Sequence, residues 1–254
     1  MTRIKPIVAA AALGMLSPAV SCGGSGEVEI CPGTGIPVYR KSDEGSYRCD
    51  LAEKLDDRGV DPSSETGKAI LDAFTRPYAT VLEISDTAEL TRSNLDYLLG
   101  ELPDTARLIN FYEGTRYEIN YLDEDRSRFF ATNNRNMSAT FERFETRFLA
   151  DTSSYMMFES GMAKFLFWRF KGNAIIDFDL MDMNEDTGYV LKLHLFTDSR
   201  GYHAIFNSKL FGYLMISIVR RIIGDAVSAA NRLANSDGEF ASMPSAFVRK
   251  LRSQ

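Results

Sequence analysis

The stretch YVLKLHLFTDS at residues 189–199, followed by YHAIFNSKLFGYLMISIVRRIIGDAVSAANRLA at residues 202–234, decides the fold. The first run is rich in β-branched, aromatic and leucine residues, which is typical of a covered strand. The second has the 3.6-residue apolar period of a helix, which we predict over residues 204–235. The apolar residues of this helix are spread over a broad part of its surface, so we expect other elements to cover most of it. They are Phe206, Leu210, Leu214, Ile218, Ile222, Val227 and Leu233.

Upstream of this pair, residues 115–197 have the composition of a series of strands. Apolar and polar residues alternate from Thr115 onward, and short polar or glycine-containing joints interrupt the pattern. Such short joints favour antiparallel pairing. Strands are predicted at residues 79–84, 128–133, 138–148, 155–158, 164–170, 175–183 and 189–197. Helices are predicted at 61–75, opened by Asp61 and Pro62, and at 86–100, where Asp86 and Glu89 fit a capping box.

This order of elements resembles the helix-grip fold of the START and birch-pollen-allergen superfamily. The residues that carry the resemblance are KFLFWRFKG at 164–172 and the two runs quoted above, within a region spanning 77–235. The resemblance implies an α+β fold in which a curved antiparallel β-sheet is wrapped around a long C-terminal helix, with a hydrophobic cavity between them. Members of that superfamily mostly bind or transport lipids and other apolar molecules, and a minority catalyse cyclisation or hydrolysis.

Aromatic and aliphatic residues in the predicted strands and helix supply candidates for a ligand pocket. The chain holds 17 Phe, 11 Tyr and one Trp, and ligand pockets are lined mostly by apolar and aromatic side chains. The candidates are Phe165, Phe167, Trp168, Phe178, Leu193, Phe206, Leu210, Leu214 and Ile218. A packed core uses the same residue types at the same spacing, so a filled core remains the alternative.

One set of polar residues is a candidate for catalysis. Asp177 and Asp179 share one face of their predicted strand, and Lys192 and His194 share one face of the next, so the four can meet across a hairpin. A histidine beside a carboxylate can act as a general base. The pattern favours the other interpretation, a solvated outer face with a cross-strand ion pair.

Residues 1–21 have the three parts of an export signal: basic Arg3 and Lys5, an apolar run at 7–16 and a small-residue cleavage site ending at Ser21. With Cys22 next, the segment resembles the lipobox of bacterial lipoproteins, in which that cysteine carries the lipid. The resemblance implies a lipid-anchored protein of the cell envelope, on the periplasmic face of the outer membrane where the source has two membranes. An ordinary secretory signal cut after Ser21 is the alternative.

The other two cysteines, Cys31 and Cys49, are predicted to form a disulfide, as expected of an even pair in an oxidising compartment. We therefore divide the chain into four parts. These are a signal peptide at 1–21, a lipid-anchor tether with a disulfide-pinned loop at 22–60, a helix-grip-like ligand-binding domain at 61–235, and a C-terminal tail at 236–254.

Composition and motif searches exclude several function classes. The formal net charge is −6, and the signal contains Arg3 and Lys5 but no acidic residue, so its loss makes the chain more negative. This charge argues against a nucleic-acid partner. No spacing typical of a metal site or a cofactor motif occurs, so we predict neither. The sequence favours binding or carriage of a hydrophobic, lipid-like ligand. A filled-core envelope scaffold and a cyclase- or hydrolase-like enzyme using His194 and Asp177 are the alternatives.

Overall fold

The structure, a computed structural model, describes residues 27–32, 34, 36–40, 47–134, 137–165, 168–183, 186–235 and 244–252. The side chains of residues 27, 40, 47, 163–165 and 168–170 are outside this description. Cys22 and the predicted signal peptide therefore lie outside the described residues.

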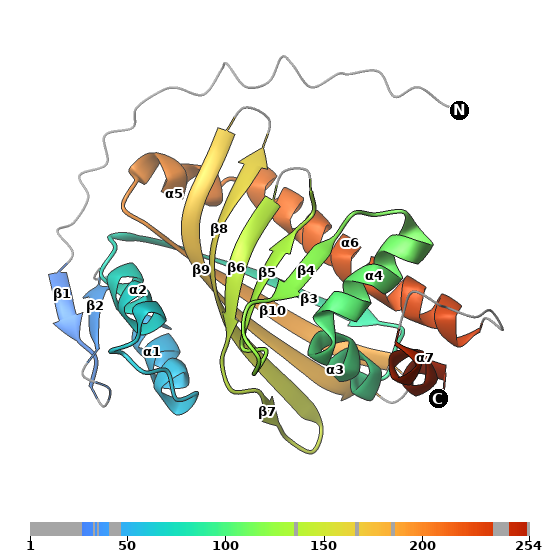
Figure 1. The fold of residues 1–254 in the computed structure, drawn as a ribbon. Helices are drawn as coiled ribbons and strands as arrows, with labels where there is room; N and C mark the ends of the chain where they lie inside the picture. Colours follow the sequence, from blue (N-terminus) through green and yellow to red (C-terminus); the bar gives the residue numbers. More distant parts are fainter. Residues whose placement is uncertain are drawn as a thin grey trace, which may run out of the picture.

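An antiparallel sheet of eight strands forms the centre of the described chain (Figure 1). Its order is β3-β10-β9-β8-β6-β5-β4, with β7 paired to one end of β8. The strands are β3 (Tyr78–Ala88), β4 (Glu118–Tyr121), β5 (Arg128–Thr132), β6 (Met137–Arg143), β7 (Arg147–Phe148), β8 (Thr152–Phe165), β9 (Trp168–Met183) and β10 (Asp186–Thr197). The sheet curves around the long helix α6 (Lys209–Ala234), so the chain has the predicted α+β, helix-grip-like fold.

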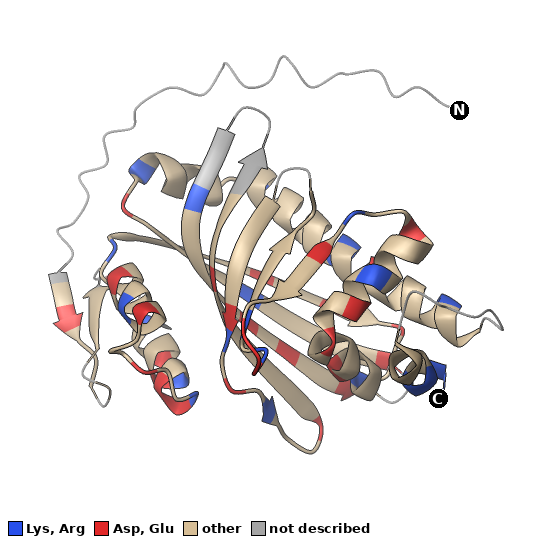
Figure 2. Ribbon diagram, in the orientation of Figure 1, with Lys and Arg blue, Asp and Glu red and all other residues tan. Residues whose placement is uncertain are grey.

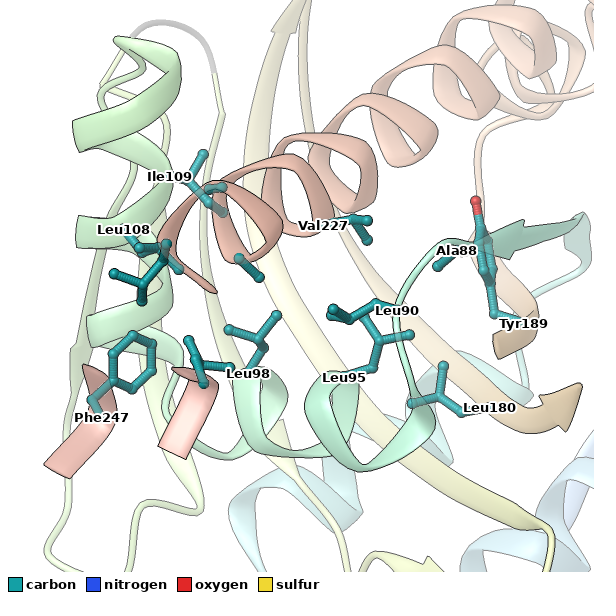
Figure 3. Packing of buried hydrophobic residues seen from close by; sticks show 14 of the residues in the cluster. Ala88, Leu90, Leu95, Leu98, Leu108, Ile109, Leu180, Tyr189, Val227 and Phe247 are labelled. Carbon is teal, nitrogen blue, oxygen red and sulfur yellow. The ribbon is translucent and has the colours of Figure 1, made fainter. Parts of the chain in front are cut away.

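Helices α3 (Arg92–Gly100), α4 (Leu102–Glu113) and α7 (Ser245–Arg252) join α6 on one side of the sheet, which we call the inner face. Alternation along β10 directs Tyr189 and Leu193 to this face. Figure 3 shows part of the apolar cluster that these elements build: Leu95, Leu98, Leu108, Ile109, Leu180, Tyr189, Val227 and Phe247. Burial of this cluster fastens one end of α6 to the sheet.

Two helices and a small hairpin cover the opposite side, which we call the outer face. The elements are β1 (Glu27–Ile30), β2 (Pro37–Arg40), α1 (Tyr47–Asp57) and α2 (Glu65–Phe74). Phe74 of α2 packs edge-on against Phe196 of β10, with 5.5 Å between ring centroids. A disulfide between Cys31 and Cys49, predicted from the sequence, joins the hairpin to α1 across a Cα–Cα distance of 5.4 Å. Both faces of the central strands are therefore covered, which explains their nearly continuous apolar sequences.

The predicted loop at 22–60 is wrong over its later part. Helix α1 packs Leu51 and Leu55 into the second apolar cluster, and these side chains are buried. Arg58, just beyond the helix, donates hydrogen bonds to the backbone oxygens of Glu145 and Ser154 at 2.6 and 2.9 Å. Apolar residues recur only weakly at helical spacing in residues 50–59, so the sequence did not predict this helix. Its stability comes from tertiary packing.

Several element boundaries differ from the sequence prediction. Helix α2 begins at Glu65 with Ser64 as its cap, and not at Asp61 and Pro62. Strand β3 continues to Ala88, because β10 pairs with it as far as Thr187, so residues 86–89 are not a helix cap. The cap of α3 is Thr91. Strands β8 and β9 are single long strands that pair with each other as far as Phe165 and Trp168, so the predicted strand 164–170 spans the end of one and the start of the next. Composition identified these segments as extended but did not locate the boundary between β8 and β9.

The predicted helix 204–235 is two helices, α5 (Arg200–Phe206) and α6, with a break at Asn207 and Ser208. The Ser208 hydroxyl accepts a hydrogen bond from the backbone N–H of Phe211 at 3.2 Å and so caps α6. Asn207 accepts one from the Thr80 hydroxyl at 3.0 Å. The apolar period runs through both helices and masks this polar break.

The predicted tail at 236–254 contains helix α7. Phe247 and Leu251 are each 2% exposed and belong to the inner cluster. The Phe247 ring lies 5.5 Å from that of Tyr97 on α3. Three of its eight residues are basic, Arg249, Lys250 and Arg252, which made this segment look like a charged tail in the sequence.

Charge is spread over the helices, and Figure 2 shows both signs along α1 and α2. Among the helices that the structure describes, none is long and apolar enough to cross a membrane.

Candidate functional site

A cavity of about 1030 Å³ lies between the inner face of the sheet and helix α6. Strands β5, β6, β8, β9 and β10 supply one wall, and α3, α4, α5 and α6 supply the other. Its volume is at the upper end of the range for small-molecule sites, roughly 300–1,000 Å³. Protein interiors normally leave few voids larger than a water molecule, so this volume is a feature of the fold.

The helical wall has the spacing of one face of α6. Phe211, Met215, Ile218 and Ile222 recur every three or four residues and line the cavity. Of the helix candidates named from sequence, Ile218 lines it, as does Phe206 of α5. Leu210 is 67% exposed, and neither it nor Leu214 is among the lining residues. The break at Ser208 starts α6 in a phase that turns these two leucines away.

Aromatic rings form much of the sheet wall. Phe178 and Leu193, both named from sequence, line the cavity. Phe129 and Phe141 stack on neighbouring strands, with ring centroids 4.9 Å apart and an interplanar angle of 8°. Phe167 lies outside the described residues, as do the side chains of Phe165 and Trp168, so the structure does not place these three candidates.

Glu159 is an acidic residue on the sheet wall, in the interior of strand β8. It lies opposite Phe141 of β6 and Ala174 of β9, two other residues that line the cavity. Burial raises the pKa of its carboxyl from the ordinary 4.5 to about 7. Glu159 forms no hydrogen bond or ion pair with the described residues. The carboxyl therefore faces the cavity without a protein partner in the part of the chain that the structure describes.

Three of the other charged residues around the cavity have partners on their own elements or nearby. The Arg76 guanidinium pairs with Asp72 at 2.8 Å. Glu113 accepts a hydrogen bond from the Ser228 hydroxyl at 2.9 Å. Arg221 faces Asp225 at 3.7 Å, and its side chain is 71% exposed. These three groups are paired, whereas Glu159 is not paired with any described residue.

The catalytic candidates from sequence do not line the cavity. Asp177, Asp179 and His194 are absent from its lining, and alternation places them on the outer face. Asp177 and His194 are buried there at 3% and 7% exposure, so the interpretation as a solvated face is also wrong. The cause is helix α1, which covers this face.

Ion pairs on the outer face differ from the cross-strand pairing predicted. The Lys54 ammonium of α1 lies 2.6 Å from the Asp177 carboxylate, whereas Lys192 lies 3.5 Å from Glu83. Burial lowers the pKa of His194 to about 4, although nearby Asp177 opposes the change. His194 is therefore neutral at ordinary pH and belongs to the packing between α1 and the sheet. The described residues contain no group of three His, Cys, Asp or Glu side chains arranged to hold a metal ion.

Sequence reasoning missed Glu159 although a signal was present. The predicted strand 155–158 ended just before Glu159, although β8 continues to Phe165. Continuing its period-two alternation gives Tyr155, Met157, Glu159 and Gly161 on the same face. An acidic residue on the apolar face of a strand is the signal that would have identified it.

No protein-family model matches the chain, and no curated protein matches it. Among solved structures, it is similar to Ara h 8.0201, with 9% identity over 59% of this chain and 96% of that chain and a TM-score of 0.42. It is similar to the hypothetical protein jhp0584 from Helicobacter pylori, with 10% identity over 60% and 88% and a TM-score of 0.42. It is also similar to the Zhui aromatase/cyclase from Streptomyces sp. R1128, with 13% identity over 64% and 100% and a TM-score of 0.41. Identities this low concern the fold alone.

Proposed function

We propose that this chain binds a hydrophobic small molecule, lipid-like or polyaromatic, in the cavity between the sheet and α6. The observation that carries the proposal is a cavity of about 1030 Å³ lined from both walls by apolar and aromatic side chains. Transfer of apolar surface from water into such a cavity is favourable by roughly 25 cal/mol per Å². Burial of the ligand, without a covalent step, supplies the affinity.

The alternatives named from sequence have less support. A scaffold with a filled core would not have a cavity of about 1030 Å³ between the sheet and α6. A hydrolase or cyclase built on His194 and Asp177 would require a substrate on the outer face, where α1 and α2 pack. Non-covalent carriage or sensing is therefore the function that the cavity supports best.

Cavity-filling substitutions are expected to remove binding. Ala131→Phe on β5 and Met215→Trp on α6 add rings from opposite walls, where the new side chains have space to enter. We expect either variant to weaken binding of the neutral fluorophore N-phenyl-1-naphthylamine by at least about tenfold, equivalent to about 1.4 kcal/mol. Fluorescence titration measures this, and native mass spectrometry of the purified protein detects any copurifying ligand.

The matched control is Ala204→Phe, which adds the same ring at an exposed position of α5. It should bind the fluorophore as the wild type does. Equal affinity in the wild type and both cavity variants would contradict the proposal, provided that circular dichroism shows the variants to be folded.

We also propose that the chain is exported and anchored to the cell envelope by a lipid on Cys22, on the periplasmic face of the outer membrane where two membranes exist. The support is the signal-like segment before that residue. Cys22→Ala is expected to abolish metabolic labelling with an alkyne fatty acid and to move the protein from the membrane to the soluble fraction. Unchanged labelling in the variant would refute the anchor.

A further inference from the structure

We propose that Glu159 selects ligands that carry a cationic nitrogen, so that the apolar body of the ligand fills the cavity and its protonated amine pairs with the Glu159 carboxylate. The inference rests on the proposed function, because it names the chemical class that the same cavity prefers. It assigns a specificity-determining role to one residue and leaves the rest of the cavity to supply hydrophobic affinity.

The position of Glu159 is the first support. Its neighbours across the two adjoining strands are Phe141 and Ala174, neither of which offers a side-chain hydrogen-bond donor. The nearest positions on the same face of its own strand, Met157 and Gly161, likewise offer none. A carboxyl on such a wall gains nothing from its neighbours, so a structural role as a partner within the described fold is excluded.

The charges around the cavity are the second support. Six other charged residues line it: Arg76, Glu113, Arg116, Lys171, Asp198 and Arg221. Three lining residues are tyrosines: Tyr117, Tyr189 and Tyr202. None of these groups contributes to the pKa of Glu159, which burial alone raises. The described residues therefore provide no countercharge, and a ligand is free to provide it.

The cost of burying the ionised Glu159 carboxylate without a partner indicates which charge a ligand should carry. An ionised carboxylate in apolar surroundings is unfavourable unless it is paired and hydrogen-bonded. An ammonium group removes that cost and adds a charge-assisted hydrogen bond. A neutral ligand offers the carboxylate no countercharge, and an anionic ligand adds a like charge that disfavours binding. Above neutral pH the expected order of affinity is cation, neutral molecule, anion.

Three probes with the same eight-carbon chain test this order: octylamine, 1-octanol and octanoate. At about pH 8.5 the amine is protonated, as a lysine side chain would be, and Glu159 is mostly ionised. Displacement of N-phenyl-1-naphthylamine gives the three affinities. We expect octylamine to bind at least about tenfold more tightly than 1-octanol, the size of one charge-assisted hydrogen bond. The advantage should shrink at about pH 5.5, where Glu159 is protonated.

Glu159→Gln should abolish the preference, so that octylamine binds no more tightly than 1-octanol. Glu124→Gln, which removes the same charge from an exposed turn, is the matched control and should keep the preference. Equal affinities for amine and alcohol in the wild type, a preference for octanoate, or an amine preference that survives in Glu159→Gln would each overturn the inference while the proposed function stands. Failure of all three probes and of the fluorophore to bind the wild type would overturn both.

Discussion

Replacing Glu159 with glutamine is expected to increase the free energy of unfolding by between about 1 and 3 kcal/mol at pH 8.5 and to leave it nearly unchanged at pH 4. The pKa of this carboxyl rises from 4.5 to about 7 on folding because burial disfavours its charge. A pKa difference of one is worth about 1.4 kcal/mol, so the full difference corresponds to about 3.5 kcal/mol. Partial screening of the carboxylate by solvent at the open cavity lowers the expected effect to between about 1 and 3 kcal/mol.

The sign follows from proton binding. Below pH 4.5 Glu159 is protonated in both the folded and the unfolded chain, so its ionisation costs no stability. Between pH 4.5 and 7 the folded chain holds the proton and the unfolded chain has lost it, so stability falls as the pH rises. Above pH 7 the cost is complete. Glutamine has no proton to lose, and the difference between variant and wild type should grow across this window.

Urea unfolding at several pH values between 4 and 9 measures the difference, with Glu124→Gln as the control that should match the wild type. The comparison between variants is essential because His194 has the opposite effect. Its pKa is lowered from 6.5 to about 4, so its stabilising contribution is present above pH 6.5 and is lost as the pH falls. A difference in the free energy of unfolding between Glu159→Gln and wild type that does not change with pH would contradict the raised pKa of Glu159.

The fold could be predicted from sequence to the extent that its signal is local. The strand composition of residues 175–197 and the helical period after Gly201 each depend on neighbouring residues, and both elements exist. The boundary between β8 and β9 and the break at Ser208 were missed because apolar residues run through both. Tertiary pairing decides such boundaries: β3 extends to Ala88 because β10 offers a partner along its whole length.

The apolar lining of the cavity could be predicted from the sequence, but its acidic residue, Glu159, was not. Phe178, Leu193, Phe206 and Ile218 line the cavity because aromatic and branched residues at strand or helix spacing have to face some interior. Which interior they face depends on strand register. His194 and Asp177 share a face, as predicted, yet α1 buries that face on the side away from the cavity. A segment with a weak helical pattern thus removed the catalytic candidates from the site.

Phe247→Ala is expected to lower the free energy of unfolding by about 3–5 kcal/mol, the usual cost of removing a buried phenylalanine ring. Phe247 is 2% exposed and packs among residues of α3, α4 and α6, including Leu98, Leu108 and Leu233. Its ring lies 5.5 Å from that of Tyr97. Loss of the ring leaves a cavity where α7 meets three other helices, and an eight-residue helix has little stability of its own to keep it docked.

The control is Phe111→Ala on α4, where the ring is 60% exposed and the expected change is below about 1 kcal/mol. Urea unfolding of both variants at one pH gives the comparison. A cost for Phe247→Ala as small as that of the control would mean that residues 245–252 behave as the tail predicted from sequence. A large cost would show that α7 helps to hold the end of α6 nearest Leu233, and hence the helical wall of the cavity, against the sheet. In that case the variant should also weaken binding of N-phenyl-1-naphthylamine, since α6 supplies Ile218 and Ile222 to the cavity.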